Sequence, residues 1–475
     1  MAFNSLTFIL FIFLVFCIYL RLPLRHQNIL LLAASYFFYC WWDWRFSFLI
    51  LTTTISDYYI GKAIYEEQSS SRKIRLLTTS VSVNLVILGF FKYCNFFIES
   101  LATFLELLGI QAHLPVLQII LPLGISYYTF RSLTYTIDVY RGQTRPAQNI
   151  IDYALFVSFF PQLVSGPIER ARDLLPQITT KRSITYESLA RGISLILTGY
   201  FKKIAIADSL APFVSTAFSS PGTLSSGELL TGVYAFSFQL YADFSGYTDI
   251  SRGIGLLLGF RLAENFRAPY LSKNITEFWR RWHISLSNWL RDYLYISLGG
   301  NRQGSLRTYC NLILTMLLCG LWHGAAWTYV LWGAVHGLYL MLHRIFFRNR
   351  GKEDNFRQPL MQWLLNLIKT LITFHLVAFA WILFRAVTLN DAFYYFVNLF
   401  RYEGLMRIDH TVIFACLVVI CLDMVETWFE THAWLADRRM RRPVRYALAQ
   451  ILFISAVTAA IAHVNTLTPF IYFQF

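Results

Sequence analysis

The amino-acid sequence predicts an all-α integral membrane protein with about 11 to 13 transmembrane helices and shorter re-entrant or interfacial helices around a central tunnel. Three observations predict this class. Hydrophobic residues make up 56% of the 475 residues and charged residues only 14%, whereas soluble domains carry about 25% charged residues. Apolar runs approach the ~20 residues that cross a bilayer. Most Lys and Arg residues lie in short loops between these runs, as in membrane proteins.

Composition also argues against other classes of protein. The formal net charge of +14 could suggest a partner of nucleic acid, but the basic residues are dispersed among short loops. Membrane lipid is therefore expected as a partner, and nucleic acid is not. None of the seven cysteines forms a CxxC pair, which argues against a disulfide framework or a zinc site, and no metal site is predicted. No long polar linker divides the chain, so residues 1–475 are expected to form one integral domain.

The apolar runs give the expected spans in chain order. They are residues 5–20, 28–42, 46–64, 75–91, 117–138, 188–207, 228–258, 308–323, 327–347, 361–384, 411–429 and 446–463. Two further segments do not fit a span. Residues 92–113 are amphipathic and are expected along the outer surface. Residues 151–165 are too short for a span and contain Pro161, which is typical of a re-entrant or interfacial element.

The charges of the loops predict the orientation of the chain. Basic loops are placed in the cytoplasm, and residues 260–307 among them carry eight Lys or Arg against three acidic residues. The loop 209–227, residues 385–410 and the C-terminal tail 464–475 are placed outside. Basic residues follow the first apolar run instead of preceding it, which indicates a retained helix with an external N-terminus.

Several charged residues fall inside the expected spans. Arg131 and Asp138 are seven residues apart and so share a helix face. Arg252 follows Asp249 by three residues, which makes it a candidate partner. A charge at the centre of a span costs about 2.5 to 3.5 kcal/mol on insertion scales, so pairing or a wet cavity is expected. Structural ion pairs and substrate contacts both remain open, and the glycines around Asp249 favour close helix packing.

Two histidines, His283 and His323, stand in apolar and aromatic surroundings. Helical spacing places His283 on an inward stripe and neighbouring arginines on the other face. The stripe contains Trp279, Leu286, Leu290 and Tyr293. His323 is followed by Gly324, the first of three small residues that allow a substrate or another backbone to approach closely. Each imidazole could be a hydrogen-bonded core residue, but a buried, neutral imidazole is also what a general base requires.

The blocks around these histidines resemble the membrane-bound O-acyltransferase (MBOAT) superfamily, and most closely its bacterial branch of alginate O-acetyltransferases and related cell-wall polymer acyltransferases. They are FWRRWHISLSNWLRDYLYI, LGGNRQG and GLWHG. Upstream, in the order of that branch, come YYTFRSLTYTIDVYRG, FFPQLVSGPIER, GYFKKIAIAD and YADFSGYTDISRGIGLLLGF. The resemblance covers residues 120–345 and rests on several long blocks in order.

The resemblance implies an O-acyltransferase of the bacterial cytoplasmic (inner) membrane that passes an acyl group, expected to be acetyl, from a cytosolic thioester towards a polysaccharide or peptidoglycan outside. It implies that His323 is the general base and that His283 orients the donor or polarises its carbonyl. No permanently bound cofactor is expected, because the thioester, acetyl-CoA or an acyl carrier protein, is a substrate. An extracytoplasmic SGNH-type esterase-like partner is implied to complete transfer to the acceptor.

Two further groups of residues are candidates for this chemistry. The inner-loop cations could bind the anionic donor, although a cytoplasmic loop is basic in any case. They are Arg280, Arg281, Arg291 and Arg302. In the tail, Tyr472 could carry the acyl group between the two sides, because a phenol, with a pKa of ~10, is easier to activate than a sugar hydroxyl. The aromatic residues of the tail could instead anchor the last helix at the interface.

Other functions remain open at this point. Within the enzymes, D-alanyl transfer to teichoic acids and acylation of a lipid or secreted protein use related chemistry. A transporter of a polymer or small solute is a different class, which would favour repeated halves with broken helices in matching positions. The sequence shows no such symmetry, and a transporter would leave the two histidines without a shared task.

Overall fold

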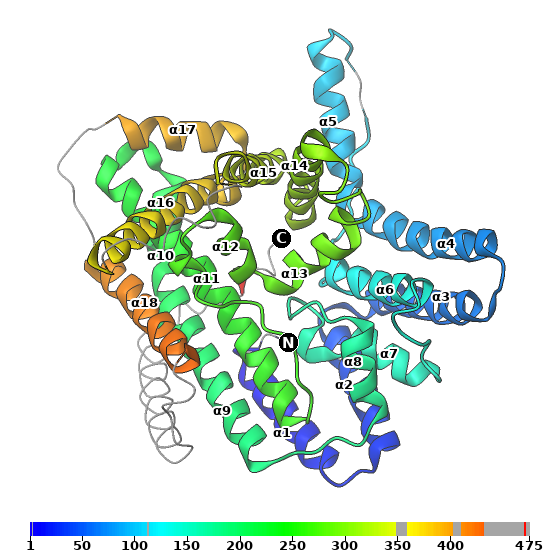
Figure 1. Ribbon diagram of the computed structural model, residues 1–475. Coiled ribbons are helices and arrows are strands. Elements are labelled where there is room, and N and C mark those ends of the chain that lie inside the picture. Colours follow the sequence, from blue (N-terminus) through cyan, green and yellow to red (C-terminus); the bar gives the residue numbers. More distant parts are fainter. Residues whose placement is uncertain (2, 112–113, 348–358, 402–409, 432–469, 472–475) are drawn as a thin grey trace. The chain divides into compact units, whose positions relative to one another are not determined.

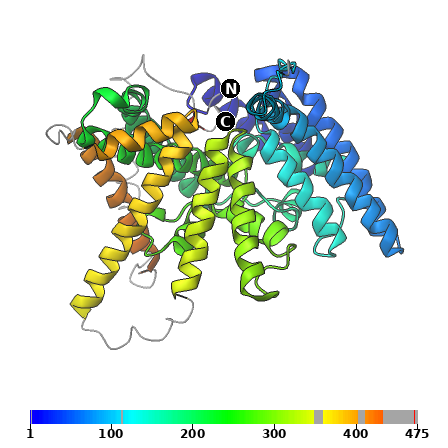
Figure 2. The ribbon, with the colours of Figure 1, turned by 90° about the horizontal axis from the view of Figure 1, so that it is seen from above.

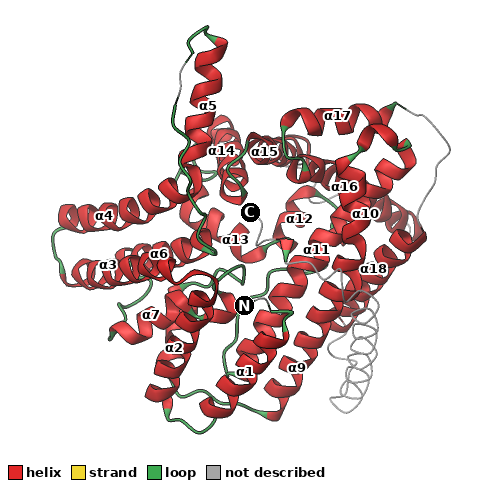
Figure 3. Cartoon of the chain, turned by 180° about the vertical axis from the view of Figure 1, so that it is seen from behind, coloured by secondary structure: helices red, strands yellow, loops and turns green. Residues whose placement is uncertain are grey.

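The computed structural model describes the chain except residues 2, 112–113, 348–358, 402–409, 432–469 and 472–475. The described residues form helices and turns and no strand (Figure 3), so the all-α prediction is confirmed. They divide into two compact units, which are described separately. The first contains Met1–Ile196 and Ile250–Ala263, and the second Leu197–Asp249 and Glu264–Phe475.

Four helical segments in the described part of the chain are long and apolar enough to cross a membrane. They are Ser70–Leu107, Gly304–His323, Trp327–Phe347 and Leu360–Arg385. The last three fall on runs expected to be spans, and the first contains the expected span 75–91 and continues beyond it. The expected span 446–463 lies outside the described residues, and the total number of spans stays a prediction.

The first unit is built from nine helices and the C-terminal end of α11. They are α1 (Leu6–Tyr19), α2 (Leu24–Asp43), α3 (Ser47–Glu66), α4 (Ser70–Leu88), α5 (Cys94–Leu107), α6 (Ile125–Tyr140), α7 (Ile150–Ser158), α8 (Ala171–Thr179) and most of α9 (Tyr186–Tyr200). Helices α3, α4 and α6 lie side by side (Figure 1). Between them the buried carboxylate of Asp57 accepts hydrogen bonds from Ser80 (2.6 Å) and Asn84 (2.8 Å), so this polar group is satisfied within an apolar packing.

The boundary expected at residue 91 falls on a π-helical turn. Helix α4 continues through a π-helical turn, Gly89–Tyr93, into α5 without a break, and the chain changes direction there (Figure 1). No proline interrupts this stretch, and a π-turn accommodates one extra residue without ending the helix. The amphipathic pattern therefore begins at a bend, where α5 follows α4 in a new direction.

Arg131 forms hydrogen bonds with the short segment 151–165, which the sequence suggests is re-entrant or interfacial. Its buried guanidinium donates to the carbonyl oxygens of Gln162 (3.0 Å) and Leu163 (3.3 Å). These residues follow α7, whose nine residues cannot cross a bilayer. A charged side chain on α6 thus satisfies carbonyl groups that no regular helix satisfies at this point.

The second unit holds the C-terminal helices and most of α11. Its helices are α10 (Asp208–Ser219), α11 (Ser226–Leu257), α12 (Ile275–Arg281), α13 (Ile284–Trp289), α14 (Gly304–His323), α15 (Trp327–Phe347), α16 (Pro359–Arg385), α17 (Leu389–Phe400) and α18 (His410–Thr431). Helices α14, α15 and α16 lie side by side (Figure 2). In α11, a Cβ on Gly246 would lie 2.7 Å from the carbonyl oxygen of Gly199, so this glycine serves close helix packing, as expected.

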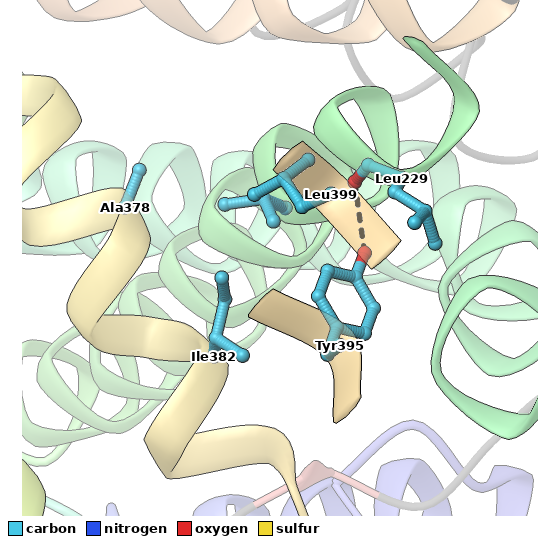
Figure 4. Packing of buried hydrophobic residues seen from close by; sticks show 6 residues of the cluster. Leu229, Ala378, Ile382, Tyr395 and Leu399 are labelled. Carbon is cyan, nitrogen blue, oxygen red and sulfur yellow. Dashed lines mark hydrogen bonds between the residues drawn. The ribbon is translucent and has the colours of Figure 1, made fainter. Parts of the chain in front are cut away.

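Two segments that are expected outside the membrane are more regular than the sequence suggested. The expected loop 209–227 contains α10, and residues 385–410 contain α17, which begins with a capping box of Thr388 and Asp391. Helix α17 supplies two members of a buried apolar cluster, and the hydroxyl of Tyr395 donates to the carbonyl oxygen of Leu229 (2.8 Å; Figure 4). The cluster is Leu229, Val233, Ala378, Ile382, Tyr395 and Leu399.

We predict that Gly333→Ala destabilises the pair of helices α14 and α15. A Cβ at position 333 would collide with the backbone carbonyl group of Met316, which cannot move without shifting α14, and overpacking of this kind costs about 1 to 3 kcal/mol. Thermal unfolding of the purified protein in detergent should show a lower Tm. Gly89→Ala is the matched control, because a Cβ there meets nothing within 4 Å. Equal Tm values for both variants would contradict the packing.

Candidate functional site

His283 lies at a break between two short helices. Helix α12 ends at Arg281 and α13 begins at Ile284, and His283 between them has φ 42° and ψ 55°, in the left-handed region. Among the described residues other than glycine, only His283 and Ala268 have a positive φ. Such a conformation is uncommon outside glycine, and where it occurs the surrounding structure enforces it, often at functional sites. The continuous helix expected through His283 is therefore wrong.

A neighbouring segment causes this break by pairing with the backbone. The N–H of Ile284 donates to the carbonyl oxygen of Asn265 (2.9 Å), and the N–H of Ser285 donates to Oδ1 of the same residue (3.2 Å). The N–H of Arg267 donates to the carbonyl oxygen of Arg281 (3.0 Å). These bonds satisfy backbone groups that a continuous helix would otherwise use internally.

The inward orientation predicted for His283 is nevertheless confirmed. The imidazole is fully buried, and its four expected companions, Trp279, Leu286, Leu290 and Tyr293, are each at most 8% exposed. The ring of Phe244 on α11 meets His283 at 4.8 Å between centroids. The histidine is thus held in an aromatic environment by contacts from a helix distant in sequence.

His323 is the last residue of α14, at the end of a span-length helix. Its ring packs against the rings of Trp332 and Phe384, each at 5.3 Å between centroids. The small residue after it has a specific use: a Cβ on Gly324 would collide with the ring of Tyr329, so glycine lets this ring cover the helix end. Close approach was expected at Gly324, and here the approaching group is an aromatic side chain.

The structure brings the two predicted histidines together. The ring centroids of His283 and His323 are 6.4 Å apart, at an interplanar angle of 62°, although forty residues separate them in the sequence. Trp322 contacts both rings, at 6.0 Å from His283 and 4.9 Å from His323. Two imidazoles at this separation can act on neighbouring atoms of one bound molecule.

Among the described residues, His283 is buried with its polar side-chain atoms unpaired, a property that it shares with Gln162 and several other buried residues. Neither of its ring nitrogens has a hydrogen-bond partner within the described part of the chain. Burial lowers the pKa of His283 to about 3, so the ring is neutral at physiological pH. A neutral imidazole offers one N–H donor and one lone pair, and buried polar atoms without a partner call for a functional or solvent explanation.

A third histidine, His336, extends this cluster and was not singled out from the sequence. It is fully buried on α15, and the indole N–H of Trp279 donates to its Nδ1 (3.3 Å). The ring of Trp332, one turn earlier, lies 4.8 Å from His336 and 5.3 Å from His323. The spacing of Trp332 and His336 by four residues could have placed both on one helix face, but their contact with Trp279 depends on tertiary packing.

The four candidate donor-binding arginines differ in what surrounds them. Arg281 pairs with Glu277 (2.7 Å) and Arg291 with Asp292 (2.6 Å). Arg280 and Arg302 are exposed, and neither has an ion-pair partner among the described residues. Arg280 and Arg302 are therefore the members of this set whose charge is not offset by a neighbouring carboxylate. Among all the residues that the structure describes, no group of three or more His, Cys, Asp and Glu residues could hold a metal ion.

Tyr472 lies outside the described residues, but the two residues before it are placed. The ring of Phe470 is fully buried, and the N–H of Ile471 donates to Oδ2 of Asp243 (2.8 Å). Asp249, which lies on α11 like Asp243, forms an ion pair with Lys202 (2.8 Å). The sequence gives no sign of Lys202, and the pairing of Asp249 with Arg252 stays a prediction.

Comparison with known proteins identifies a protein family that this chain matches. Residues 143–385 match the model of the MBOAT, membrane-bound O-acyltransferase family. The chain is 46% identical over 409 residues to a probable alginate O-acetylase of Azotobacter vinelandii, covering 85% of this chain and 78% of the relative. It is 38% identical over 389 residues to the peptidoglycan O-acetyltransferase of Helicobacter pylori (76% and 71%). The teichoic acid D-alanyltransferase of Bacillus subtilis is 31% identical over 288 residues (58% and 71%).

The depressed pKa of His283 predicts a dependence of stability on pH. The unfolded chain takes up a proton on this histidine near pH 6.5 and the folded chain only near pH 3, so its contribution to stability is complete above pH 6.5 and is lost as the pH falls. Relative to His283→Gln, the wild type should lose up to about 1.4 kcal/mol per pH unit between pH 6 and 4. Melting temperatures at several pH values measure this. The exposed His26 gives a control, His26→Gln, and parallel curves for wild type and His283→Gln would contradict the burial argument.

Proposed function

Because the chain belongs to the membrane-bound O-acyltransferase family, we propose that it transfers an acetyl group from a cytosolic thioester, for esterification of an extracytoplasmic polysaccharide or peptidoglycan. The protein is an integral membrane enzyme that moves acyl groups to hydroxyl groups. The observation that carries the proposal is the contact between His283 and His323 in a buried aromatic cluster. The named activities of the relatives define the acyl group and the kind of acceptor.

In the proposed mechanism, His323 is the general base. A hydroxyl group is a poor nucleophile until a base removes its proton. As His323 takes this proton, the hydroxyl oxygen forms a bond with the thioester carbonyl carbon and the carbon–sulfur bond breaks. The departing thiolate then receives the proton from the imidazolium. His283 is neutral, so its N–H can donate to the carbonyl oxygen, where negative charge develops in the transition state.

We assign the donor to the cytoplasmic side of a bacterial inner membrane, with both chain termini on the opposite side. The thioester is a substrate, either coenzyme A or a carrier protein, and no resident cofactor takes part. Both carriers are anionic, and cations on the inner loop attract them. Arg280 and Arg302 are the strongest candidates among the four arginines, because Arg281 and Arg291 are already paired with acidic neighbours.

The acceptor lies outside, and we infer that a separate SGNH-type esterase-like protein completes transfer to the polymer. The proposal favours acetyl over D-alanyl transfer, because the match to the alginate O-acetylase covers 85% of the chain and the match to the D-alanyltransferase only 58%. Tyr472 is the proposed relay between the two sides: its phenol would accept the acetyl group at the histidines and then donate it to the partner.

His323→Ala should abolish esterification while leaving the protein folded in the membrane. Loss of a general base lowers a rate by about 10²- to 10⁴-fold, and the small void is borne by a large aromatic cluster. His283→Ala should be severely impaired as well. Both are measured as ester content of envelope polymers against membrane abundance of the variant. Wild-type ester content in His323→Ala cells would refute the assignment of the base.

The inner loop should be reachable only from the cytoplasm. Single cysteines at Gln303 or Ser305, both exposed at the start of α14, should resist membrane-impermeant maleimides added to intact cells and react after the cells are opened. A cysteine at exposed His26 serves as a second cytoplasmic position. Labelling of residues 303 or 305 in intact cells would invert the proposed topology and separate this loop from a cytosolic donor.

Tyr472→Phe should remove polymer esters without lowering the amount of protein in the membrane. The substitution keeps the aromatic ring and deletes only the hydroxyl group that would carry the acetyl group. The measurement is ester content per molecule of membrane protein, with Phe473→Tyr in the wild-type background as a control for ring chemistry in the tail. Unchanged ester content in Tyr472→Phe would eliminate the relay while leaving the role of the histidines intact.

A further inference from the structure

Two ion pairs join the π-helical turn Phe201–Ala207 to α11. Lys202 pairs with Asp249, and the next residue, Lys203, pairs with both Asp208 (2.9 Å) and Asp243 (2.8 Å). The side chains of Lys203 and its two partners are at most 1% exposed, whereas those of Lys202 and Asp249 are 6% and 10% exposed. The Lys203 group is therefore the more deeply buried of the two.

A short segment far along the chain docks on the Lys203 group. The ammonium group of Lys203 lies 4.7 Å from the centroid of the Phe470 ring. The N–H of Ile471 donates to Oδ2 of Asp243 (2.8 Å), while Oδ1 of the same carboxylate faces Lys203. Tyr247, one turn further along α11, meets the Phe470 ring edge-on at 5.2 Å. One ring and one backbone N–H from this segment thus engage both charges of the pair.

The charges explain why this contact has chemical specificity. Lys203 lies between two aspartates, and a buried carboxylate oxygen without a donor is costly. The N–H of Ile471 supplies that donor, and the face of an aromatic ring is a favourable neighbour for the ammonium group. The group therefore has the properties of a receptor for a peptide segment that carries an aromatic residue.

The receptor is directly connected to the histidine cluster. Asp243 precedes Phe244, whose ring lies against His283 at 4.8 Å. A change in the docking of residues 470–471 therefore acts on the same turn of α11 that supports His283. We propose that Lys203 and Asp243 are positioning residues. They bind the segment Phe470–Ile471 and thereby determine where this segment lies relative to the two histidines. The inference rests on the proposed function, since it is the acyl-transfer step that the positioning serves.

The sharpest test removes the backbone donor of the segment. Ile471→Pro deletes the N–H that binds Asp243, and Ile471→Ala keeps it while removing most of the same side chain. Neither change touches the ion pair. The full-length protein in membrane vesicles receives ¹⁴C-acetyl-CoA, and label in polymer ester is measured per folded molecule. Ile471→Pro should lower kcat at least tenfold with an unchanged KM for acetyl-CoA, and Ile471→Ala should stay within about twofold. Equal kcat values for the two variants would overturn the proposal.

The neighbouring ion pair supplies a matched control for the receptor side. Lys203→Met and Lys202→Met each remove one buried cation that faces an aspartate of α11, so both lower stability. Only the first removes the cation that faces Phe470. Specific activity of the folded fraction should fall in Lys203→Met with KM unchanged, and Lys202→Met should retain it. If both variants lose activity only in proportion to folded protein, the ion pairs are purely structural and the proposal fails.

The outcomes also separate this inference from the proposed function. Inactive histidine variants together with a fully active Ile471→Pro would remove the docking role and leave the acyl-transfer chemistry standing. Active histidine variants would remove the chemistry itself, whatever the segment does. Loss of activity in both sets, with intact Ile471→Ala and Lys202→Met controls, is the pattern that the proposal requires.

Discussion

The constraint on which the structure depends is that a polar group buried among apolar helices needs a partner, because water is not there to replace it. The carboxylate of Asp57 accepts hydrogen bonds from Ser80 and Asn84. The guanidinium of Arg131 donates to backbone carbonyl groups. Lys203 forms ion pairs with two aspartates. Neither ring nitrogen of His283 has a partner in the described structure, as is also true of several other buried polar side chains. A substrate that supplies both a hydrogen-bond donor and an acceptor would give each ring nitrogen of His283 a partner.

The break in the helix at His283 follows from the same constraint. The segment around Asn265 takes up the backbone groups of Ile284 and Ser285, which allows α12 to end and α13 to begin in a new direction. The imidazole then meets Phe244 and His323 instead of continuing along a helix stripe. The left-handed conformation at His283 costs free energy, and the surrounding hydrogen bonds and aromatic contacts sustain it.

The sequence predicts most where one local pattern decides the outcome. The helix Trp327–Phe347 has the limits expected from its apolar run, and the inward side of His283 follows from spacing alone. The break at His283 could not be predicted, because its cause is backbone pairing with Asn265, eighteen residues away. Helix α17 was missed because its apolar face is short and is completed only by α11 and α16. The separation of His283 and His323 likewise depends on contacts between distant helices.

The central claim is that His283 and His323 act as one catalytic unit, and a double-substitution cycle tests it most directly. Rates of transfer from ¹⁴C-acetyl-CoA would be compared for His283→Gln, His323→Gln and the double variant, each per folded molecule. If the two rings serve a single transition state, the double variant should lose little more than the worse single variant. Losses that multiply, each histidine reducing the rate by the same factor whether or not the other is present, would show that they act independently and would contradict the account.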